Sequence, residues 1–156
     1  MDDVCEVKES RIPRAGKGLF AKQYIPPNRF IAFYTGVQVP PGSYLHDYRI
    51  GIKDPKTGKS VVIDSNDPQD GLARWCNHSC DAHAQFSVLT AGLKSMCICP
   101  TYGRYALVLQ TLFGIPKGDE ITCNYGEAYF KDASGKLNPA YHTKIRDYNK
   151  AHRKKS

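Results

Sequence analysis

The fold of this chain is decided by two short stretches, Asn77-His78-Ser79-Cys80 and Gly118-Asp119-Glu120-Ile121-Thr122-Cys123-Asn124-Tyr125-Gly126. A glycine-rich segment, Arg14-Ala15-Gly16-Lys17-Gly18-Leu19-Phe20, precedes both of them. Each segment alone has a simple structural explanation, because an Asn-His pair often caps a turn and glycines allow tight turns. The glycines also precede a predicted strand and no helix, which excludes the two common phosphate-binding loops. The information therefore lies in the joint presence and order of the three segments.

Together the three segments resemble the SET domain of protein lysine methyltransferases, over roughly residues 7 to 130. Val62-Ile63-Asp64 and Ala73-Arg74-Trp75 match the same family pattern ahead of the Asn-His pair. One departure follows the pair, where Asp81-Ala82-His83 stands in place of the family's frequent Asp-Pro-Asn.

The resemblance implies a mainly β fold with few helices (α+β). It is a β-clip-type arrangement of small sheets with a knot-like crossing of the C-terminal segment, plus a C-terminal helix. The resemblance also divides the chain, with residues 1–6 as an N-terminal extension and residues 37–65 as a variable insert within the domain. Residues 131–156 are then a post-SET segment with an amphipathic helix and a basic tail.

The resemblance also implies S-adenosylmethionine as cofactor, with S-adenosylhomocysteine as its product. The glycine-rich segment lies against the methionine part of the cofactor in the family, and the Asn-His pair binds its adenine and amino-acid ends. An aromatic residue after the second motif covers the adenine, with Phe130 as the first candidate and Tyr129 as the second. The expected cofactor residues are Ala15, Gly16, Lys17, Gly18, Leu19, Asn77, His78, Tyr129 and Phe130.

Tyr125 is the expected catalytic residue, because it occupies the position of the family's essential tyrosine. Methyl transfer from a sulfonium needs a neutral amine, and a free lysine with a pKa near 10.4 is neutral at pH 7 only about once in a thousand. A narrow aromatic channel beside a cationic sulfonium lowers that pKa, and a tyrosine hydroxyl at its end orients the amine. The expected lysine channel is formed by Tyr34, Cys123 and Tyr125, at positions that the resemblance gives, together with Tyr105.

Cys123 departs from the family, which often has Phe or Tyr two residues before the catalytic tyrosine. The smaller side chain leaves room for a second or third methyl group, but Tyr105 is able to fill the same space. The number of methyl groups added therefore stays open at this point.

Composition is that of one globular intracellular domain. The 156 residues are 41% hydrophobic and 24% charged, which suits a single core and argues against wholesale disorder. No apolar run is long enough to span a membrane, and the acidic start lacks the apolar stretch of a signal peptide. The six cysteines are therefore expected to be reduced thiols.

The formal net charge of +7 favours encounters with anionic partners. Basic residues gather at the C-terminus, either as a solubilising, frayed tail or as a contact to nucleosomal DNA. They are Lys150, Arg153, Lys154 and Lys155.

Apolar runs bounded by turn residues predict several strands. They cover residues 19–21, 30–34, 61–63, 96–99 and 105–109, with turns at 26–28, 54–58 and 100–103. Only the C-terminus shows a helical period, with Tyr141, Ile145 and Tyr148 on one face behind Asn138 as the N-cap. No internal repeat is recognised.

A histone lysine is the expected substrate and the nucleus the expected location. A non-histone protein substrate in the cytoplasm is the alternative, and a catalytically weak SET module that only binds partners is a third hypothesis. Histone tails are basic, so an acidic groove would have to offset the positive charge of this chain. The densest acidic stretch consists of Asp47, Asp54, Asp64, Asp67 and Asp70.

No metal site is expected. Many relatives carry a zinc cluster built from cysteines after the domain, but no cysteine follows Cys123 in this sequence. Cys97 and Cys99, one residue apart, fit a strand better than a pair of zinc ligands.

Overall fold

The computed structural model describes residues 2–40, 48–67, 71–90 and 106–125. These residues are mainly strands in two sheets, with two short 3-10 helices, η1 (Asp2–Val4) and η2 (Leu72–Trp75). No helix in these ranges is long and apolar enough to cross a membrane. The expected C-terminal helix, the knot-like crossing and the strand at 96–99 with its turn lie outside the described residues.

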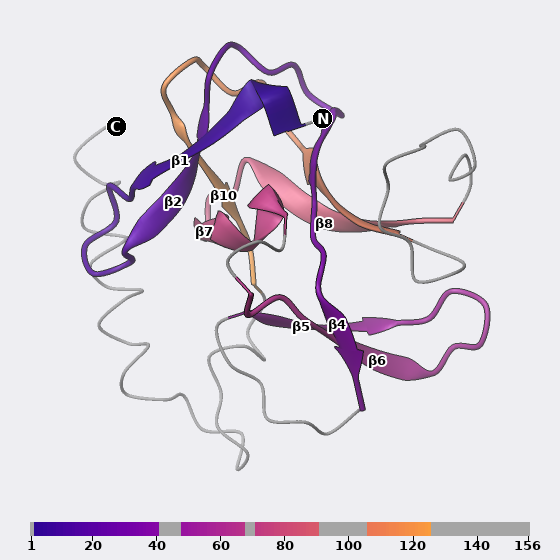
Figure 1. Ribbon diagram of the computed structural model, residues 1–156. Coiled ribbons are helices and arrows are strands. Elements are labelled where there is room, and N and C mark those ends of the chain that lie inside the picture. Colours follow the sequence, from indigo (N-terminus) through magenta and orange to yellow (C-terminus); the bar gives the residue numbers. More distant parts are fainter. Residues whose placement is uncertain (1, 41–47, 68–70, 91–105, 126–156) are drawn as a thin grey trace.

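The larger sheet carries all three diagnostic segments. Its strands lie in the order β1 (Cys5–Glu9), β2 (Lys17–Ala21), β10 (Glu120–Cys123), β8 (Ala84–Leu89), β9 (Ala106–Thr111) and β3 (Phe30–Phe33), and the short β7 (Asn77–His78) also pairs with β10 (Figure 1). β10 is antiparallel to β2 and parallel to β7 and β8. This central strand therefore brings the glycine-rich segment and the Asn-His pair beside the segment that ends in Tyr125.

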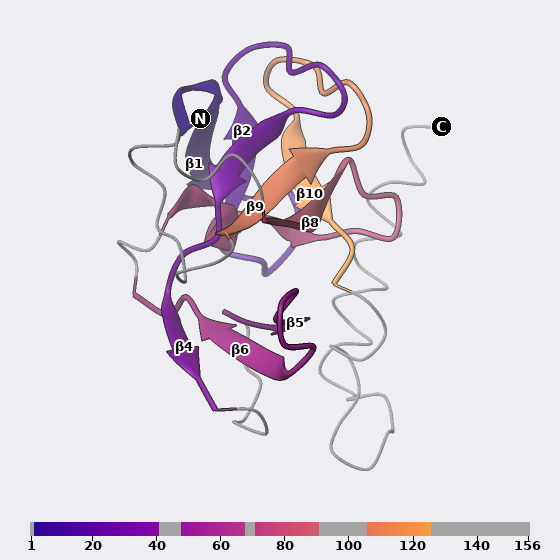
Figure 2. The ribbon, with the colours of Figure 1, turned by 90° about the vertical axis from the view of Figure 1, so that its right-hand side faces the viewer.

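The smaller sheet is formed by residues of the expected insert. Its antiparallel strands lie in the order β4 (Val37–Val39), β6 (Ser60–Asp64) and β5 (Arg49–Lys53). The predicted turn between β5 and β6 is confirmed, with Asp54 Oδ1 accepting the backbone N–H of Lys56 at 2.8 Å. The two sheets lie one above the other, and the chain passes from β3 in one to β4 in the other (Figure 2).

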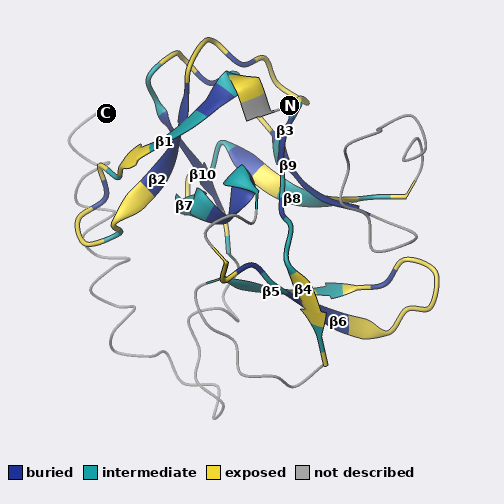
Figure 3. Ribbon diagram, viewed as in Figure 1, coloured by how far each residue is buried: buried dark blue, intermediate teal, exposed yellow. Residues whose placement is uncertain are grey.

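Residues of the larger sheet form most of the hydrophobic core, and Ile63 of β6 belongs to the same core. The predicted strands are confirmed: 19–21 is the end of β2, 30–33 is β3, one residue shorter than predicted, 61–63 is the centre of β6, and the described part of 105–109 lies in β9. Consecutive residues along these strands are buried, because both faces of the strands are covered (Figure 3). Leu19, Ile31, Leu109 and Ile121 are all 0% exposed.

The structure corrects one expectation, because residues 19–35 and 109–125 form an internal repeat. In each copy a strand (β2 or β9) leads through an Ile-Pro turn into a second strand (β3 or β10). The two turns face each other, and Ile25 and Ile115 exchange backbone N–H···O hydrogen bonds of 2.9 and 2.8 Å.

Hydrogen bonds around the two turns repeat as well. The Asn28 N–H donates to Thr111 O, just as the Gly118 N–H donates to Ala21 O, both at 2.8 Å. Asn28 has a φ of 60° and Gly118 a φ of 85°, a left-handed conformation that these two residue types tolerate best. The approximate two-fold relation therefore places the ends of β3 and β10 at equivalent positions.

Candidate active site

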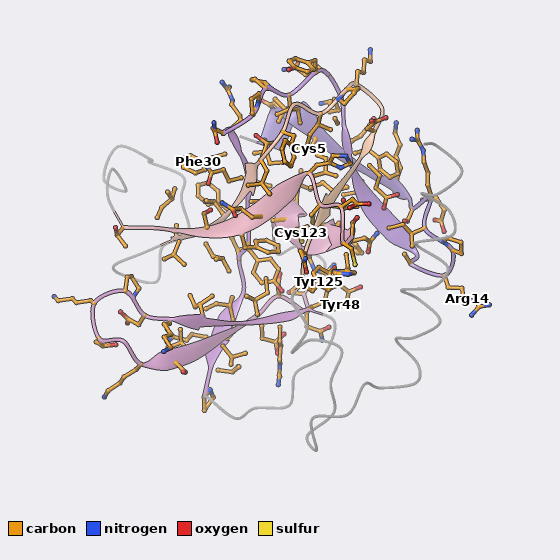
Figure 4. The ribbon with its side chains drawn as sticks, turned by 180° about the vertical axis from the view of Figure 1, so that it is seen from behind. Cys5, Arg14, Phe30, Tyr48, Cys123 and Tyr125 are labelled. Atoms are coloured by element: carbon orange, nitrogen blue, oxygen red, sulfur yellow. The ribbon has the colours of Figure 1, made fainter. Side chains whose placement is uncertain are left out.

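A cavity of about 480 Å³ lies where the ends of β3 and β10 meet the smaller sheet. Strand β5 forms one wall, and residues of η2, β8 and β9 form the others. In Figure 4, Tyr125 lies just beyond Cys123 at the end of β10. The aromatic residues that line the cavity are Tyr34, Phe86 and Tyr125.

The backbone of Cys76, the residue that follows η2, fixes the Tyr125 hydroxyl at this cavity. The hydroxyl donates a hydrogen bond to Cys76 O at 2.6 Å. Because the hydroxyl donates its proton there, its oxygen can act towards another group only as a hydrogen-bond acceptor. A protonated or neutral amine is a hydrogen-bond donor, so the arrangement can orient an amine.

Cys76 is held in place from β10. Its thiol donates to Ile121 O with a sulfur–oxygen distance of 3.4 Å, and the Cys123 thiol reaches Cys76 O at 4.0 Å. Burial, with Cys123 as a further cause, raises the pKa of the Cys76 thiol well above its usual value. The thiol therefore stays protonated and acts as a structural donor that fixes the carbonyl used by Tyr125.

His78 positions Tyr125 from the other side. Its Nδ1 accepts the backbone N–H of Tyr125 at 3.1 Å, and the two rings lie 5.4 Å apart. An accepting Nδ1 carries no proton, so the ring is neutral in this contact. Burial lowers the pKa of His78 to about 4, which keeps the ring neutral at physiological pH. The family resemblance assigned His78 to the cofactor, and the structure adds this side-chain contact.

We expect the stability of the fold to fall as the pH is lowered from about 6.5 towards 4. An unfolded histidine takes up a proton near pH 6.5, whereas the pKa of folded His78 is about 4. The unfolded state binds more protons in this window, so the contribution of His78 is fully present above pH 6.5 and is lost below it. Urea midpoints between pH 7 and 4 should fall more steeply for the parent than for His78→Gln, whose amide oxygen can accept the same N–H without titrating. Parallel curves for the two proteins would contradict this role.

Asn77 faces away from the cavity, towards the glycine-rich segment. Its Nδ2 donates to Lys17 O and Glu120 Oε1, both at 3.0 Å, and to Ser10 Oγ at 3.3 Å. Among the predicted residues that the structure describes, Tyr34 and Tyr125 line the cavity, whereas Asn77, which directly follows Cys76, contacts the glycine-rich segment.

The glycine-rich segment approaches Asn77 closely because Gly18 has no side chain. A Cβ at this position would meet Glu120 Oε1 and would lie 3.1 Å from Asn77 Nδ2. Gly16, at the end of the preceding turn, has a φ of 72°, which other residues rarely adopt. Gly18 is therefore needed for the close approach to Glu120 and Asn77, and Gly16 is needed for the turn.

Two arginines join the smaller sheet to this site. Arg49 makes a half-buried ion pair with Asp64, at 2.7 Å from Nη2 and 2.8 Å from Nε. Arg74, only 6% exposed, donates from Nε to Ser65 O at 2.7 Å. Its guanidinium lies 4.0 Å from the ring centre of Tyr48, in cation–π contact. Both line the cavity, and neither role was recognised in the sequence.

The structure places the predicted site residues in different surroundings. Lys17 and Gly18 lie beside Asn77, and Tyr34 and Tyr125 line the cavity. Cys123 is 0% exposed and packs in the core beside Cys76, outside the cavity wall. Phe86, which packs edge-on against Tyr34 at 5.3 Å, lines the cavity instead and was missed. Tyr105, Tyr129 and Phe130 lie outside the described residues.

Two carboxylates of the acidic stretch that could attract a basic tail make contacts within the protein instead. Asp54 is 6% exposed and caps its own turn, and Asp64 pairs with Arg49. Asp47 and Asp70 lie outside the described residues. Among the described residues, no group of three or more His, Cys, Asp or Glu side chains is placed to hold a metal ion.

Comparison with known proteins places this geometry in a family. The SET domain family matches residues 16–126. The histone-lysine N-methyltransferase SET9 of Phaeosphaeria nodorum is 31% identical over a match covering 72% of this chain and 15% of that protein. For the histone-lysine N-methyltransferase SETD7 of Halocynthia roretzi the identity is 25%, over 74% of this chain and 30% of that protein.

A solved structure shares the fold. The methyltransferase domain of human PR domain-containing protein 2 superposes with a TM-score of 0.60 at 18% identity, covering 81% of this chain and 79% of that one. The chain spans less than a third of the length of the two curated relatives, 15% and 30%. The family match over most of the chain, together with the β-rich architecture, shows that this protein belongs to the SET domain family.

Proposed function

We propose that this domain is a protein lysine N-methyltransferase that uses S-adenosylmethionine and acts on a histone lysine. One observation carries the proposal: the Tyr125 hydroxyl, bound to Cys76 O, lines a cavity with aromatic walls, while Asn77, the next residue after Cys76, faces the glycine-rich segment. Substrate and cofactor would then bind on either side of the Cys76-Asn77 segment.

The residues on the cofactor side fit an amino-acid ligand. Asn77 uses its Nδ2 within the protein, which leaves Oδ1 as an acceptor for an ammonium group. Gly18 lets the glycine-rich segment lie close to Glu120 and Asn77, because a Cβ there would meet Glu120 Oε1. When bound, S-adenosylmethionine supplies a methyl group on a sulfonium sulfur, for transfer to a neutral lysine amine with the sulfur leaving as a thioether.

The residues on the substrate side prepare the amine. Tyr34, Phe86 and Leu107 line the cavity with apolar surface, which strips water from an entering ammonium and favours its neutral form. Deprotonating free lysine at pH 7 costs roughly 4 kcal/mol, so this environment matters for the rate. The Tyr125 oxygen then accepts an N–H of the amine and directs the nitrogen lone pair towards the methyl donor.

The proposal is tested by incubating the domain with S-adenosylmethionine and arrayed lysine peptides, with the products resolved by mass. Methylation of histone peptides supports the full proposal, and selective methylation of other peptides supports the non-histone alternative. Cofactor binding by calorimetry without transfer to any peptide would favour the weakly catalytic binding module. A histone substrate also implies action in the nucleus, which imaging of the full-length protein would check.

Asn77→Ala should weaken binding of S-adenosylhomocysteine by about 1–3 kcal/mol, because the ligand loses an acceptor and Glu120 loses a donor. Calorimetry measures the change. Gln85→Ala is a suitable control, since Gln85 is an exposed residue of β8 on the cavity side. Equal affinities for parent and Asn77→Ala would count heavily against the proposed cofactor pocket.

A further inference from the structure

The carboxylate of Glu120 is the centre of a hydrogen-bond network that the sequence motifs do not explain. Glu120 is only 9% exposed. Its Oε1 accepts the Ser10 hydroxyl at 2.7 Å and Asn77 Nδ2 at 3.0 Å, and its Oε2 accepts the Arg11 backbone N–H at 2.9 Å. All of these partners act as donors, so the position requires acceptors on both oxygens. A carboxylate provides them and a carboxamide does not.

This network decides which end of the Asn77 carboxamide faces the protein. Nδ2 lies between Lys17 O and Glu120 Oε1, at 3.0 Å from each. Both neighbours are acceptors, so a carboxamide turned by 180° would place Oδ1 against two oxygens, one of them on a carboxylate. Oδ1 therefore lies on the opposite edge of the carboxamide, and the three hydrogen bonds that Asn77 makes with Ser10, Lys17 and Glu120 all use Nδ2.

We propose that Glu120 is a positioning residue that makes the cofactor site selective for a hydrogen-bond donor. By holding Nδ2 of Asn77, it turns Oδ1 towards the ligand, where an amino group can donate to it. The inference rests on the proposed function, because the ligand is the amino-acid end of S-adenosylmethionine or of its product. Glu120 itself touches no ligand and acts only through Asn77.

The test compares two ligands that differ in one group, S-adenosylhomocysteine and its analogue lacking the α-amino group. Calorimetry on the parent should give at least about tenfold tighter binding of the amino ligand, the usual worth of a hydrogen bond to a charged group. In Asn77→Ala the ratio of the affinities for the amino ligand and its analogue should be close to one. Glu120→Gln should lower the ratio several-fold, because a glutamine must turn its NH₂ towards either the Arg11 N–H or the Asn77 carboxamide.

Asp119→Asn is the matched control, since it makes the same acid-to-amide change on the adjacent residue. The Asp119 side chain is 42% exposed and lies 3.9 Å from the Arg11 guanidinium, outside the network. The ratio of the affinities for the two ligands should be the same in Asp119→Asn as in the parent. A Glu120→Gln protein that weakens both ligands equally and keeps the parent ratio would overturn the proposal, because a merely structural role lowers both affinities together.

A second variant keeps the test decisive if Glu120→Gln does not fold. Glu120→Asp retains the carboxylate but withdraws it by one methylene, so the ratio should again fall, and a parent-like ratio would again overturn the positioning role. If the parent binds neither ligand, the proposed function fails and this inference fails with it. If the parent binds the amino ligand and the ratios do not change, the positioning role alone is refuted.

Discussion

Replacing Tyr125 with phenylalanine is expected to slow methyl transfer by about two orders of magnitude or more, the usual effect of removing one preorganised polar group from a reacting centre. The phenyl ring keeps its packing against His78 and its place in the cavity wall. The lost hydroxyl leaves Cys76 O without a 2.6 Å donor, which should cost about 1 kcal/mol of stability. The Tyr125→Phe protein should therefore still fold and bind S-adenosylhomocysteine, whereas its rate of methyl transfer should fall.

Tyr34→Phe is the matched control for this experiment. The Tyr34 hydroxyl donates to Tyr48 O at 2.7 Å, so it fixes the start of β5 and is not expected to meet the amine. This variant should mainly change peptide affinity or the number of methyl groups added. The measurement is single-turnover transfer to a saturating lysine peptide, with products resolved by mass. A Tyr125→Phe protein that transfers methyl groups at the parent rate would remove Tyr125 from the catalytic role.

The site could be predicted where a residue type is demanded by direct contact. Gly18 is required because a Cβ would run into Glu120 and Asn77, and Asn77 is required because it donates to a carbonyl and a carboxylate together. Such demands leave a short pattern of residue types in the sequence. The strands could be predicted for a similar reason, since the runs at 19–21 and 61–63 are buried and rich in apolar residues.

The lining of the cavity could not be predicted in the same way. Alternation along a strand would put residues 123 and 125 on one face. However, β10 ends at Cys123, and the chain beyond it no longer follows the alternation. Cys123 therefore packs against Cys76 in the core, whereas Tyr125 reaches the cavity. Phe86 lines the cavity only because β8 pairs with β9 beside Tyr34, a tertiary arrangement without a local signal.

The internal repeat was missed because few of its residues are identical. What the two copies share is a turn geometry, in which an Ile-Pro pair is followed by a residue with positive φ, Asn28 in one and Gly118 in the other. Asparagine and glycine are the two residue types that adopt this conformation most readily. The repeat is therefore defined by equivalent conformational demands and not by identical residues.

The second large effect is expected at Gly36, which joins β3 to β4. A Cβ at this position would meet the backbone oxygen of Asp64, and would lie 2.6 Å from its carbonyl carbon and 2.9 Å from the Cα of Ser65. These are main-chain atoms, so no side-chain rotation can relieve the contact. Gly36→Ala should force β4 and β6 away from β3 and destabilise the fold by about 3 kcal/mol, at the upper end of overpacking effects.

Gly51→Ala provides the comparison within the same small sheet. Gly51 lies on β5, is exposed, and a Cβ there would meet nothing within 4 Å. Alanine at this position should leave stability unchanged or raise it by less than about 1 kcal/mol through a stiffer unfolded chain. Urea unfolding of the two variants separates a general effect of alanine in this sheet from the specific backbone contact. Equal midpoints would show that the close approach of Gly36 to Asp64 does not hold the two sheets together. A large loss confined to Gly36→Ala would show that it does, and that the cavity between Tyr34 and β5 depends on it.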